Sequence, residues 1–461
     1  MLRRSFLSGV FDKITMKYKI FMASLGCDKN LVDTEMMLGQ LCQSGQYELT
    51  DDETQAEILI VNTCCFIGDA KEESIQTLIE LGALKETANA KVLIAAGCLA
   101  QRYEKEIRSE LPEVDAIVGT LSIGQIEEAV TQALAGARKE YMTDIQAAPY
   151  TGEQLLTTGG HYAYLKIAEG CDKRCTYCVI PSVRGGYRSV PMETLLAEAT
   201  RLAEKGVKEL ILVAQETTVY GKDLYGEKKL PELLTKLCEI EGVQWIRLLY
   251  CYPEEITDEL IAVMKKEDKI CNYLDLPIQH ASDTILRSMG RRTTREELRS
   301  RIAQMREQIP GICLRTTLIT GFPGETQEDH EILKSFVEEI RFDRLGCFTY
   351  SREENTVAAK MPSQVKAGVK KKRRDEIMRM QQTIAFEKGQ EMVGLVCQAF
   401  VEGEIQEDAA EGRCYVARTY KDAPGVDGYL FIRCNASLMS GDLVTVKITA
   451  CHEYDLIGEL I

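Results

Sequence analysis

The sequence predicts an α/β protein in three parts: an open parallel α/β domain, a partial barrel of six strand-helix units, and a small antiparallel β-barrel at the C-terminus. Three observations favour this fold class. Apolar strand-like runs alternate with helical patterns over most of the 461 residues, as parallel sheets require. Only six such units follow one another in the middle of the chain, too few for a closed eight-stranded barrel. After about residue 390 the runs become short and β-rich, without helices between them.

The first domain is expected over residues 17–135. Its strand-like runs are KIFMASLG, EILIVNT, KVLIAAG and DAIVGT, and each is followed by a helical pattern. Cys27, Cys64 and Cys98 each stand at the carboxyl end of one of these runs. Parallel strands end at one edge of a sheet, and open α/β sheets bind their ligands there, so we expect the three thiols to lie together. The alternative is three ordinary buried thiols, because free cysteine packs as a small hydrophobe. Neighbouring Cys65 should point to the other side of its strand and pack.

The second domain is expected over residues 157–385. We identify six strands there, in HYAYLKIAEG, KELILVAQE, QWIRLLYCYP, YLDLPIQH, CLRTTLITGF and RLGCFTYS. In barrels built from strand-helix units the functional residues lie at the carboxyl ends of the strands. We therefore expect the active site at that end of the partial barrel.

Three cysteines directly after the first of these strands form the most informative motif of the chain. Cys171, Cys175 and Cys178 lie in AEGCDKRCTYCVIP, with the spacing C-x3-C-x2-C. Three thiolates can hold three irons of a [4Fe-4S] cluster and leave the fourth iron free for a small molecule. A zinc site with a distant fourth ligand is the alternative, since closed zinc sites take four ligands. The nearest fourth cysteine, Cys238, is too distant in sequence to belong to the same loop.

Other polar residues stand at strand ends or follow the cysteine loop. Gln215 and Glu216 end the second strand of the partial barrel, and GFPGET, with Gly321 and Glu325, follows the fifth. The alternatives are a helix cap for the first pair and a tight strand-to-helix connection for the second. Arg184, after the cysteine loop, is expected to contact a cofactor or the substrate, or to be a solvated charge. The basic run at 370–374 opens a helical stretch, and we expect it to be a solvated helix face.

Composition narrows the functional class. Seventeen cysteines in a long chain predict a reducing compartment and metal ligation rather than disulfides. The net charge of −15 argues against general adhesion to nucleic acid. The apolar run in MLRRSFLSGVF is shorter than that of a secretory signal, although a transit peptide or a later start at Met16 stays open for residues 1–15. No run reaches the length of a membrane span, so we expect a cytoplasmic protein without membrane contact.

The third domain is expected over residues 390–461. Its short β-rich runs predict a small barrel. Residues 391–461 contain five Lys or Arg against twelve Asp or Glu, a net charge of −7. A domain that negative repels phosphate and favours a basic protein as partner.

The C-x3-C-x2-C motif resembles the signature of the radical S-adenosylmethionine (SAM) enzymes. SLGCDKNLVDTE, VNTCCFI and AAGCLAQRY resemble the three cysteine blocks of the methylthiotransferase family within it, and the likeness covers nearly the whole chain after residue 16. The resemblance implies two [4Fe-4S] clusters and SAM as cofactors. It places the SAM-binding cluster on Cys171, Cys175 and Cys178. It further implies an auxiliary cluster on Cys27, Cys64 and Cys98, SAM contacts at Gln215, Glu216, Gly321 and Glu325, and a TRAM-like domain at the C-terminus. No side chain is expected to act as a catalytic acid or base.

The resemblance also bears on the substrate. CDKRCTYCVIPSVRGGYRS, YLDLPIQH, YSREENT and ARTYKDAPGVDGY resemble the branch of the family that adds a methylthio group to the β-carbon of an aspartate in ribosomal protein twelve of the small subunit. This branch implies that protein as partner, free or on the ribosome, an external electron donor, and a monomeric enzyme. Two alternatives stay open. One is a tRNA adenosine methylthiotransferase, and the other is a non-enzymatic iron-sulfur or zinc scaffold that docks on the ribosome.

Overall fold

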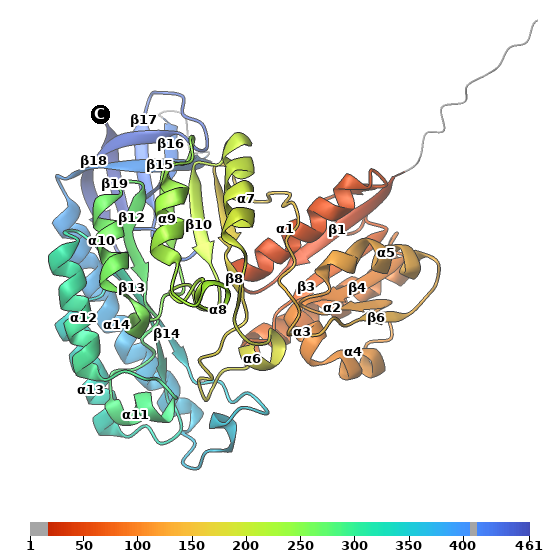
Figure 1. Cartoon of the computed structure of the whole chain (residues 1–461), viewed down its shortest axis with the longest axis horizontal. Helices are drawn as coiled ribbons and strands as arrows, with labels where there is room; N and C mark the ends of the chain where they lie inside the picture. The colour runs from red at the N-terminus through yellow and green to blue at the C-terminus, as the bar shows by residue number, and fades with distance from the viewer. Residues whose placement is uncertain (1–16, 406–412) are drawn as a thin grey trace, which may run out of the picture.

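The structure, a computed structural model, describes residues 17–405 and 413–461. In Figure 1 the front domain, in red and orange, lies beside the partial barrel, in yellow and green, and the blue tail barrel covers one end of it. The predicted three-part fold class is confirmed. The expectation for residues 1–15 lies outside the described part of the chain. Among residues 17–405 and 413–461, no helix combines the length and the apolarity that a membrane crossing needs.

The front domain is a six-stranded, wholly parallel sheet. Its strand order is β2-β1-β3-β4-β5-β6, and the four predicted strands are its centre. The two edge strands were not predicted, because YEL and KEY are mostly polar and lack the apolar run that marks the equally short β5. The strands are β1 (Tyr18–Ser24), β2 (Tyr47–Leu49), β3 (Ile58–Thr63), β4 (Val92–Ala96), β5 (Ala116–Val118) and β6 (Lys139–Tyr141). The helices are α1 (Asp28–Gln43), α2 (Gly68–Thr87), α3 (Gly97–Arg102), α4 (Glu104–Glu110), η1 (Ile123–Gln125) and α5 (Ile126–Leu134).

The partial barrel is a second parallel sheet of six strands, in the order β14-β13-β12-β11-β10-β7. All six predicted strands are present, and the sheet stays open between β14 and β7. The strands are β7 (Tyr162–Lys166), β10 (Glu209–Val213), β11 (Trp245–Leu248), β12 (Ile270–Asp275), β13 (Cys313–Thr320) and β14 (Arg344–Thr349). The connecting helices are α7 (Met192–Glu204), α9 (Leu230–Cys238), α10 (Asp258–Lys266), α12 (Arg295–Gln308), α13 (Gln327–Ile340) and α14 (Ala367–Met392).

Short elements surround the carboxyl ends of these strands. The hairpin of β8 (Ala168–Glu169) and β9 (Arg188–Ser189) encloses the cysteine loop and α6 (Ile180–Val183). The remaining short helices are α8 (Lys222–Tyr225), η2 (Pro253–Glu255), α11 (Asp283–Ser288) and η3 (Ala358–Lys360). Capping boxes at Thr294 and Thr326 start α12 and α13, because each threonine and the acidic residue three positions later satisfy each other's free amides.

The tail domain is a closed barrel in the order β15-β16-β17-β19-β18. Its strands are antiparallel except that β17 and β19 pair in parallel, so the predicted barrel is present with one parallel pair. Helix α14 continues to Met392, whose side chain packs in the barrel core. The strands are β15 (Val396–Ile405), β16 (Arg413–Thr419), β17 (Leu430–Cys434), β18 (Leu443–His452) and β19 (Asp455–Leu460).

The tail domain closes the amino end of the partial barrel. Glu209, the first residue of β10, accepts hydrogen bonds from Arg247 at 2.7 Å and from Arg418 of the tail at 2.8 Å. All three side chains are buried. Phe400 of the tail also stacks edge-on against Trp245, with ring centroids 4.6 Å apart. This junction leaves only the opposite, carboxyl end of the strands open to the front domain.

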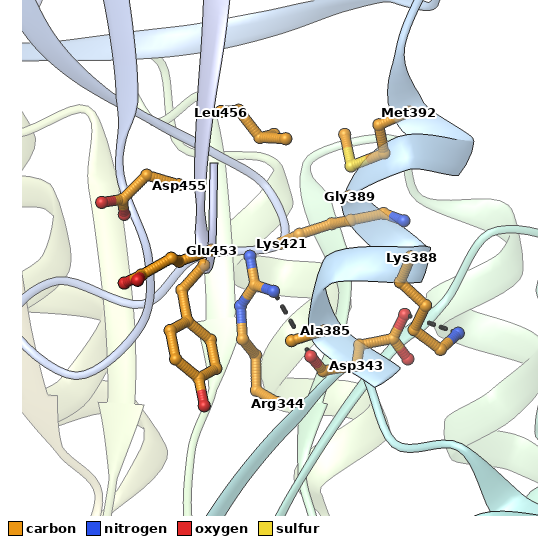
Figure 2. Close-up of a pocket in the computed structure, with 11 residues that line it drawn as sticks. Asp343, Arg344, Ala385, Lys388, Gly389, Met392, Lys421, Glu453, Asp455 and Leu456 are labelled. Carbon is orange, nitrogen blue, oxygen red and sulfur yellow. Dashed lines mark hydrogen bonds and ion pairs between the residues drawn. The ribbon is translucent and has the colours of Figure 1, made fainter. Parts of the chain in front are cut away.

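A small pocket lies at the same junction and is shown in Figure 2. Asp343 and Arg344, at the start of β14, line it together with Lys388 of α14 and Tyr454 of the tail. Lys388 and Asp343 form an ion pair of 3.1 Å across it. Because the pocket lies at the amino ends of the strands, it belongs to domain docking and not to the candidate site.

Candidate active site

The first cysteine trio lies in the loop between β8 and α6. The Cys171 amide donates to the Gly185 carbonyl at 3.2 Å, and the Cys178 amide donates to the Cys175 carbonyl at 3.0 Å, so both ends of the loop are tied. Burial raises the pKa of Cys178 to about 12, and the charges of Cys175 and Cys171 add to that rise. The three thiols therefore lie within electrostatic reach of one another in one loop.

No fourth cysteine joins this trio in the described part of the chain. Cys238 ends α9, where Glu267 and Lys269 are its charged neighbours. Burial also raises the pKa of Cys171 to about 12, so a bound metal must stabilise the thiolates. Over residues 17–405 and 413–461, no three His, Cys, Asp or Glu side chains gather closely enough to hold one metal ion. Each thiolate of a cluster binds a different iron, so a trio spaced for a cluster is compatible with that finding.

The second trio lies at the carboxyl edge of the front sheet. Cys27 caps α1, Cys64 follows β3, and Cys98 lies in the first turn of α3 after β4. Gly26 has φ of 93°, and a Cβ there would lie 2.7 Å from the Cys64 sulfur, so glycine allows this close approach. Burial raises the pKa of both Cys64 and Cys98, and the charge of Cys27 adds to it at each.

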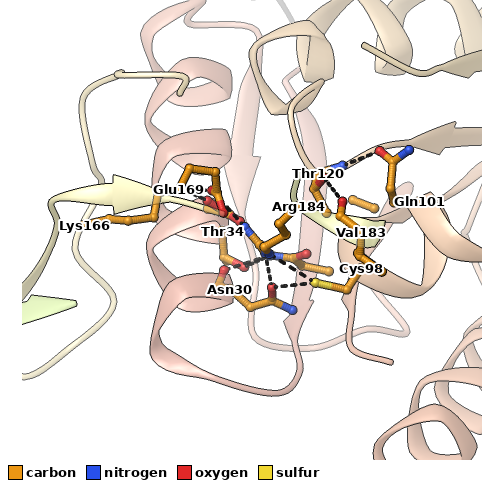
Figure 3. Close-up of polar contacts among 12 residues, drawn as sticks. Asn30, Thr34, Cys98, Gln101, Thr120, Lys166, Glu169, Val183 and Arg184 are labelled. Carbon is orange, nitrogen blue, oxygen red and sulfur yellow. Dashed lines mark hydrogen bonds and ion pairs between the residues drawn. The ribbon is translucent and has the colours of Figure 1, made fainter. Parts of the chain in front are cut away.

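A buried polar network joins Cys98 of the second trio to the barrel residues that flank the first trio (Figure 3). Arg184, which follows the first trio, donates through Nε to the Cys98 sulfur at 3.3 Å. Its other nitrogens pair with Glu169 at 3.0 Å and with Asp33 at 2.9 Å. Lys166, at the end of β7, contacts the same two carboxylates. Arg184 is buried, so the alternative of a solvated charge is wrong. Its guanidinium connects the barrel to the front domain, and contact with a cofactor or the substrate stays a prediction.

The YSREENT segment after β14 adds a second connection. Glu353, 2% exposed, accepts from Lys71 of α2 at 2.8 Å and from Arg102 of α3 at 3.0 Å. Arg102 also donates to the Cys65 carbonyl at 3.3 Å. The Cys65 side chain packs in the front-domain core, as expected. Both connections hold the cysteine edge of the front sheet against the open end of the barrel.

Gln215 and Glu216 lie directly after β10, beside the first trio. Glu216 accepts from the Thr218 amide at 3.0 Å through one oxygen, and its other oxygen has no hydrogen-bond partner among the described residues. That oxygen is 3.7 Å from Lys173, within the cysteine loop. Burial raises the pKa of Glu216 to about 7. Gln215 donates to Glu169 at 3.0 Å and leaves its own oxygen unpaired. Such a buried, partly unsatisfied carboxylate is suited to a ligand cation.

In the GFPGET turn, unlike at Glu216, the buried carboxylate is engaged by neighbouring groups of the chain. Glu325 accepts from the amides of Gly321 and Phe322 and pairs with Arg373 of α14 at 3.0 Å. Gly321 has φ of 74°, and a Cβ there would lie 2.2 Å from Lys370. The carboxylate therefore stabilises the turn itself, and any contact of Gly321 and Glu325 with a cofactor stays a prediction. Lys370 and Arg373 both contact the barrel, so the expectation of a wholly solvated basic run at 370–374 is wrong.

Sequence reasoning did not single out Lys29 and Tyr250. Lys29 follows Cys27 by two residues, and its ammonium lies 3.1 Å from the centre of the Tyr250 ring. Tyr250, just after β11, has φ of 60° and donates its hydroxyl to Asp28 at 3.0 Å. A left-handed, non-glycine residue is uncommon, and such strain is concentrated at functional sites. The only signal in the sequence was the position of Lys29 beside a cysteine of the second trio.

Comparison with known protein families divides the chain in the same way. Residues 19–119 match the uncharacterized protein family UPF0004, residues 165–336 match the Radical SAM superfamily, and residues 393–461 match the TRAM domain. Among solved structures, the radical S-adenosylmethionine methyltransferase TsrM from Kitasatospora setae, with cobalamin and a [4Fe-4S] cluster bound, is similar in fold. The TM-score is 0.53 at 14% identity, covering 86% of this chain and 82% of that chain.

Close relatives match over nearly their whole length. The protein named ribosomal protein uS12 methylthiotransferase RimO from Lachnoclostridium phytofermentans is 58% identical over 441 residues, which are 95% of this chain and 99% of that protein. The protein of the same name from Pelotomaculum thermopropionicum is 51% identical and covers 97% of this chain and 100% of its own length. The chain therefore belongs to the RimO family of radical SAM methylthiotransferases.

Proposed function

We propose that this protein adds a methylthio group to the β-carbon of an aspartate in ribosomal protein uS12. One observation carries the proposal: Arg184, six residues after the first trio, donates to the Cys98 sulfur of the second trio and pairs with Glu169 of the barrel, so the cysteine edge of the front sheet docks beside the cysteine loop. The names and the 58% identity of the relatives support it. The reaction removes hydrogen at one cluster and takes sulfur from the other, so both clusters must reach one substrate. The docking of the front domain on the barrel supports this requirement.

The cofactors are two [4Fe-4S] clusters and SAM. Cys171, Cys175 and Cys178 would hold the cluster that binds SAM, and Cys27, Cys64 and Cys98 would hold the auxiliary cluster. When bound, these groups supply one-electron hydrogen abstraction and methylated sulfur, which side chains acting as acids or bases cannot supply. The residues present fit them, because each trio consists of neighbouring thiols and no fourth cysteine competes for the first trio among the described residues.

Besides the cysteines, residues of this chain would bind SAM, cover a thiol of the first trio and hold the two domains together. The Glu216 oxygen that accepts no hydrogen bond among the described residues, and lies 3.7 Å from Lys173, is suited to the ammonium of the methionine end of SAM. Tyr252 lies with its hydroxyl 3.5 Å from the Cys175 sulfur, which covers that thiol from water. Arg184 and Glu353 hold the front sheet against the open end of the barrel, an arrangement that supports one substrate space between the two trios.

The partners follow from the proposed reaction. We propose an external electron donor, a monomeric enzyme, and a cytoplasmic location where ribosomal proteins are made and assembled. The net charge of −15, with −7 in residues 391–461, favours a basic protein substrate over the phosphate backbone of tRNA.

Iron content tests the two-cluster arrangement. After anaerobic reconstitution with iron and sulfide, we expect about eight irons per wild-type chain and about four after Cys171, Cys175 and Cys178 are all changed to Ala. Cys238→Ala, which alters a cysteine outside both trios, should keep about eight. Unchanged iron in the triple variant would refute the assignment of the first trio, and intact SAM in reduced wild-type protein would favour a scaffold.

Mass spectrometry tests the substrate. A strain lacking the gene should lose the methylthio mass on uS12 and keep it on tRNA, and the wild-type gene should restore it. Loss on tRNA with uS12 unchanged would instead support the tRNA adenosine reaction.

A further inference from the structure

Lys29 carries a buried positive charge that forms no ion pair with a carboxylate in the described part of the chain. Its side chain is 6% exposed and lies in the first turn of α1. Within residues 17–405 and 413–461, its ammonium forms no ion pair or hydrogen bond, and the ring of Tyr250 is its close contact. A buried, unpaired ammonium is costly, and a positive charge at a helix N-terminus also opposes the helix dipole. The position therefore keeps a charge that folding alone disfavours.

The neighbouring carboxylates are all engaged elsewhere. Asp28 accepts from the Tyr250 hydroxyl, and Asp33 pairs with Arg184 and Lys166. Asp275 accepts from the Tyr250 amide at 3.0 Å and pairs with Arg315 at 2.8 Å. No described carboxylate therefore pairs with Lys29, although its charge lowers the pKa of the nearby Cys64 thiol against the effect of burial. An anion from outside the chain would meet this charge beside the second trio.

The location of Lys29 fits a substrate contact. It follows Cys27 of the second trio by two residues, and Tyr250 beneath it belongs to the open end of the barrel. We propose that the Lys29 ammonium binds the side-chain carboxylate of the substrate aspartate and thereby holds the adjoining β-carbon next to the second trio. This inference rests on the proposed function. It also makes Lys29 the residue that selects an aspartate over an uncharged side chain.

A two-by-two binding experiment tests this contact. The reconstituted holoenzyme, wild type or Lys29→Met, is measured against small ribosomal subunits that carry uS12 with its target aspartate or with asparagine there. We expect wild type to prefer aspartate by about tenfold or more, because hydrogen bonds to charged groups are worth about 1.5–3 kcal/mol. In Lys29→Met the preference should fall to about twofold or less, and Lys29→Arg should restore part of it.

The controls separate the possible outcomes. Lys85→Met removes an ammonium that pairs with Asp115 on the outside of the front domain, and it should keep the full preference. Iron content and the electron paramagnetic resonance spectrum of the auxiliary cluster should be unchanged in Lys29→Met. If Lys29→Met keeps the preference for aspartate but loses iron or alters that spectrum, the charge serves the cluster and the proposal is overturned. If wild type itself modifies no uS12, the proposed function fails instead.

Discussion

Buried charges are fully paired at the amino end of the partial barrel and incompletely paired at its carboxyl end. At the amino end, Glu209 lies between Arg247 and Arg418, and burial alone would raise its pKa, but the two guanidinium groups lower it to about 2. At the carboxyl end, Glu216 is also buried, and burial raises its pKa to about 7 although Lys173, 3.7 Å away and shared with Glu255, lowers it. Lys29 at the same end has no carboxylate partner among the described residues.

The amino end of the partial barrel therefore has a structural role, whereas the carboxyl end has the charge pattern of a functional site. Matched charges at the amino end fix the tail domain permanently, since a buried ion pair is strongly destabilised when one partner is removed. Unmatched charges at the carboxyl end cost stability, so they are expected where ligands bring the missing partners.

The largest effect is expected at the matched end. Glu209→Gln leaves Arg247 and Arg418 buried without their anion, and we expect it to cost about 3–5 kcal/mol of stability. Thermal unfolding and proteolysis of the tail domain measure this loss. Glu128→Gln, which removes an exposed ion pair with Lys139, is the matched control and should cost less than about 1 kcal/mol. Equal effects of the two variants would contradict the comparison.

A smaller effect is expected where the two domains meet. Arg184→Gln removes a guanidinium from Asp33 and Glu169, but Lys166 still pairs with both, so we expect a loss of about 2–3 kcal/mol. The variant also removes an N–H donor to the Cys98 sulfur, and such donors help to set cluster potentials. The midpoint potential of the auxiliary cluster should therefore become more negative while its iron content is kept. An unchanged potential would exclude this contact in the holoenzyme.

At the open end, the effect should appear in ligand binding rather than in folding. Glu216→Gln removes the anion that is suited to the ammonium of SAM, and we expect SAM affinity to fall about tenfold with little loss of stability. Equilibrium binding of SAM to the reconstituted protein measures it. Glu259→Gln, an exposed change on α10, should leave the affinity unchanged. A large loss of stability without loss of affinity would make Glu216 a structural residue.

The smallest effect tests whether a buried carboxylate with a long ion pair, to Arg201 at 3.9 Å, is costly on a helix. Glu198 on α7 is buried, one of its oxygens has no hydrogen-bond partner among the described residues, and burial raises its pKa to about 7. The folded protein therefore holds this proton more tightly than the unfolded chain, and stability should rise as the pH falls from 8 towards 5. Glu198→Gln should gain about 1–2 kcal/mol at pH 8 and nothing at pH 5. Parallel unfolding curves of variant and wild type at both pH values would contradict this.

Local patterns predicted much of the fold. All six strands of the partial barrel and the four central strands of the front sheet follow from apolar runs alone. The edge strands β2 and β6 do not, because they form only by pairing with a strand already present. The parallel pairing of β17 with β19 was also missed, since strand direction within a closed barrel depends on how the chain returns and not on local pattern.

The sequence by itself determined the two cysteine trios, since spacing and strand ends are local properties that survive in the linear chain. Only the tertiary structure decided which charges are matched. Arg184, Arg373 and Lys29 look alike in sequence, yet the first connects two domains, the second stabilises a turn, and the third has no anionic partner within the described residues. The physical reason is that the partner of a buried charge lies on a distant segment, and its distance and desolvation are set only when the segments pack.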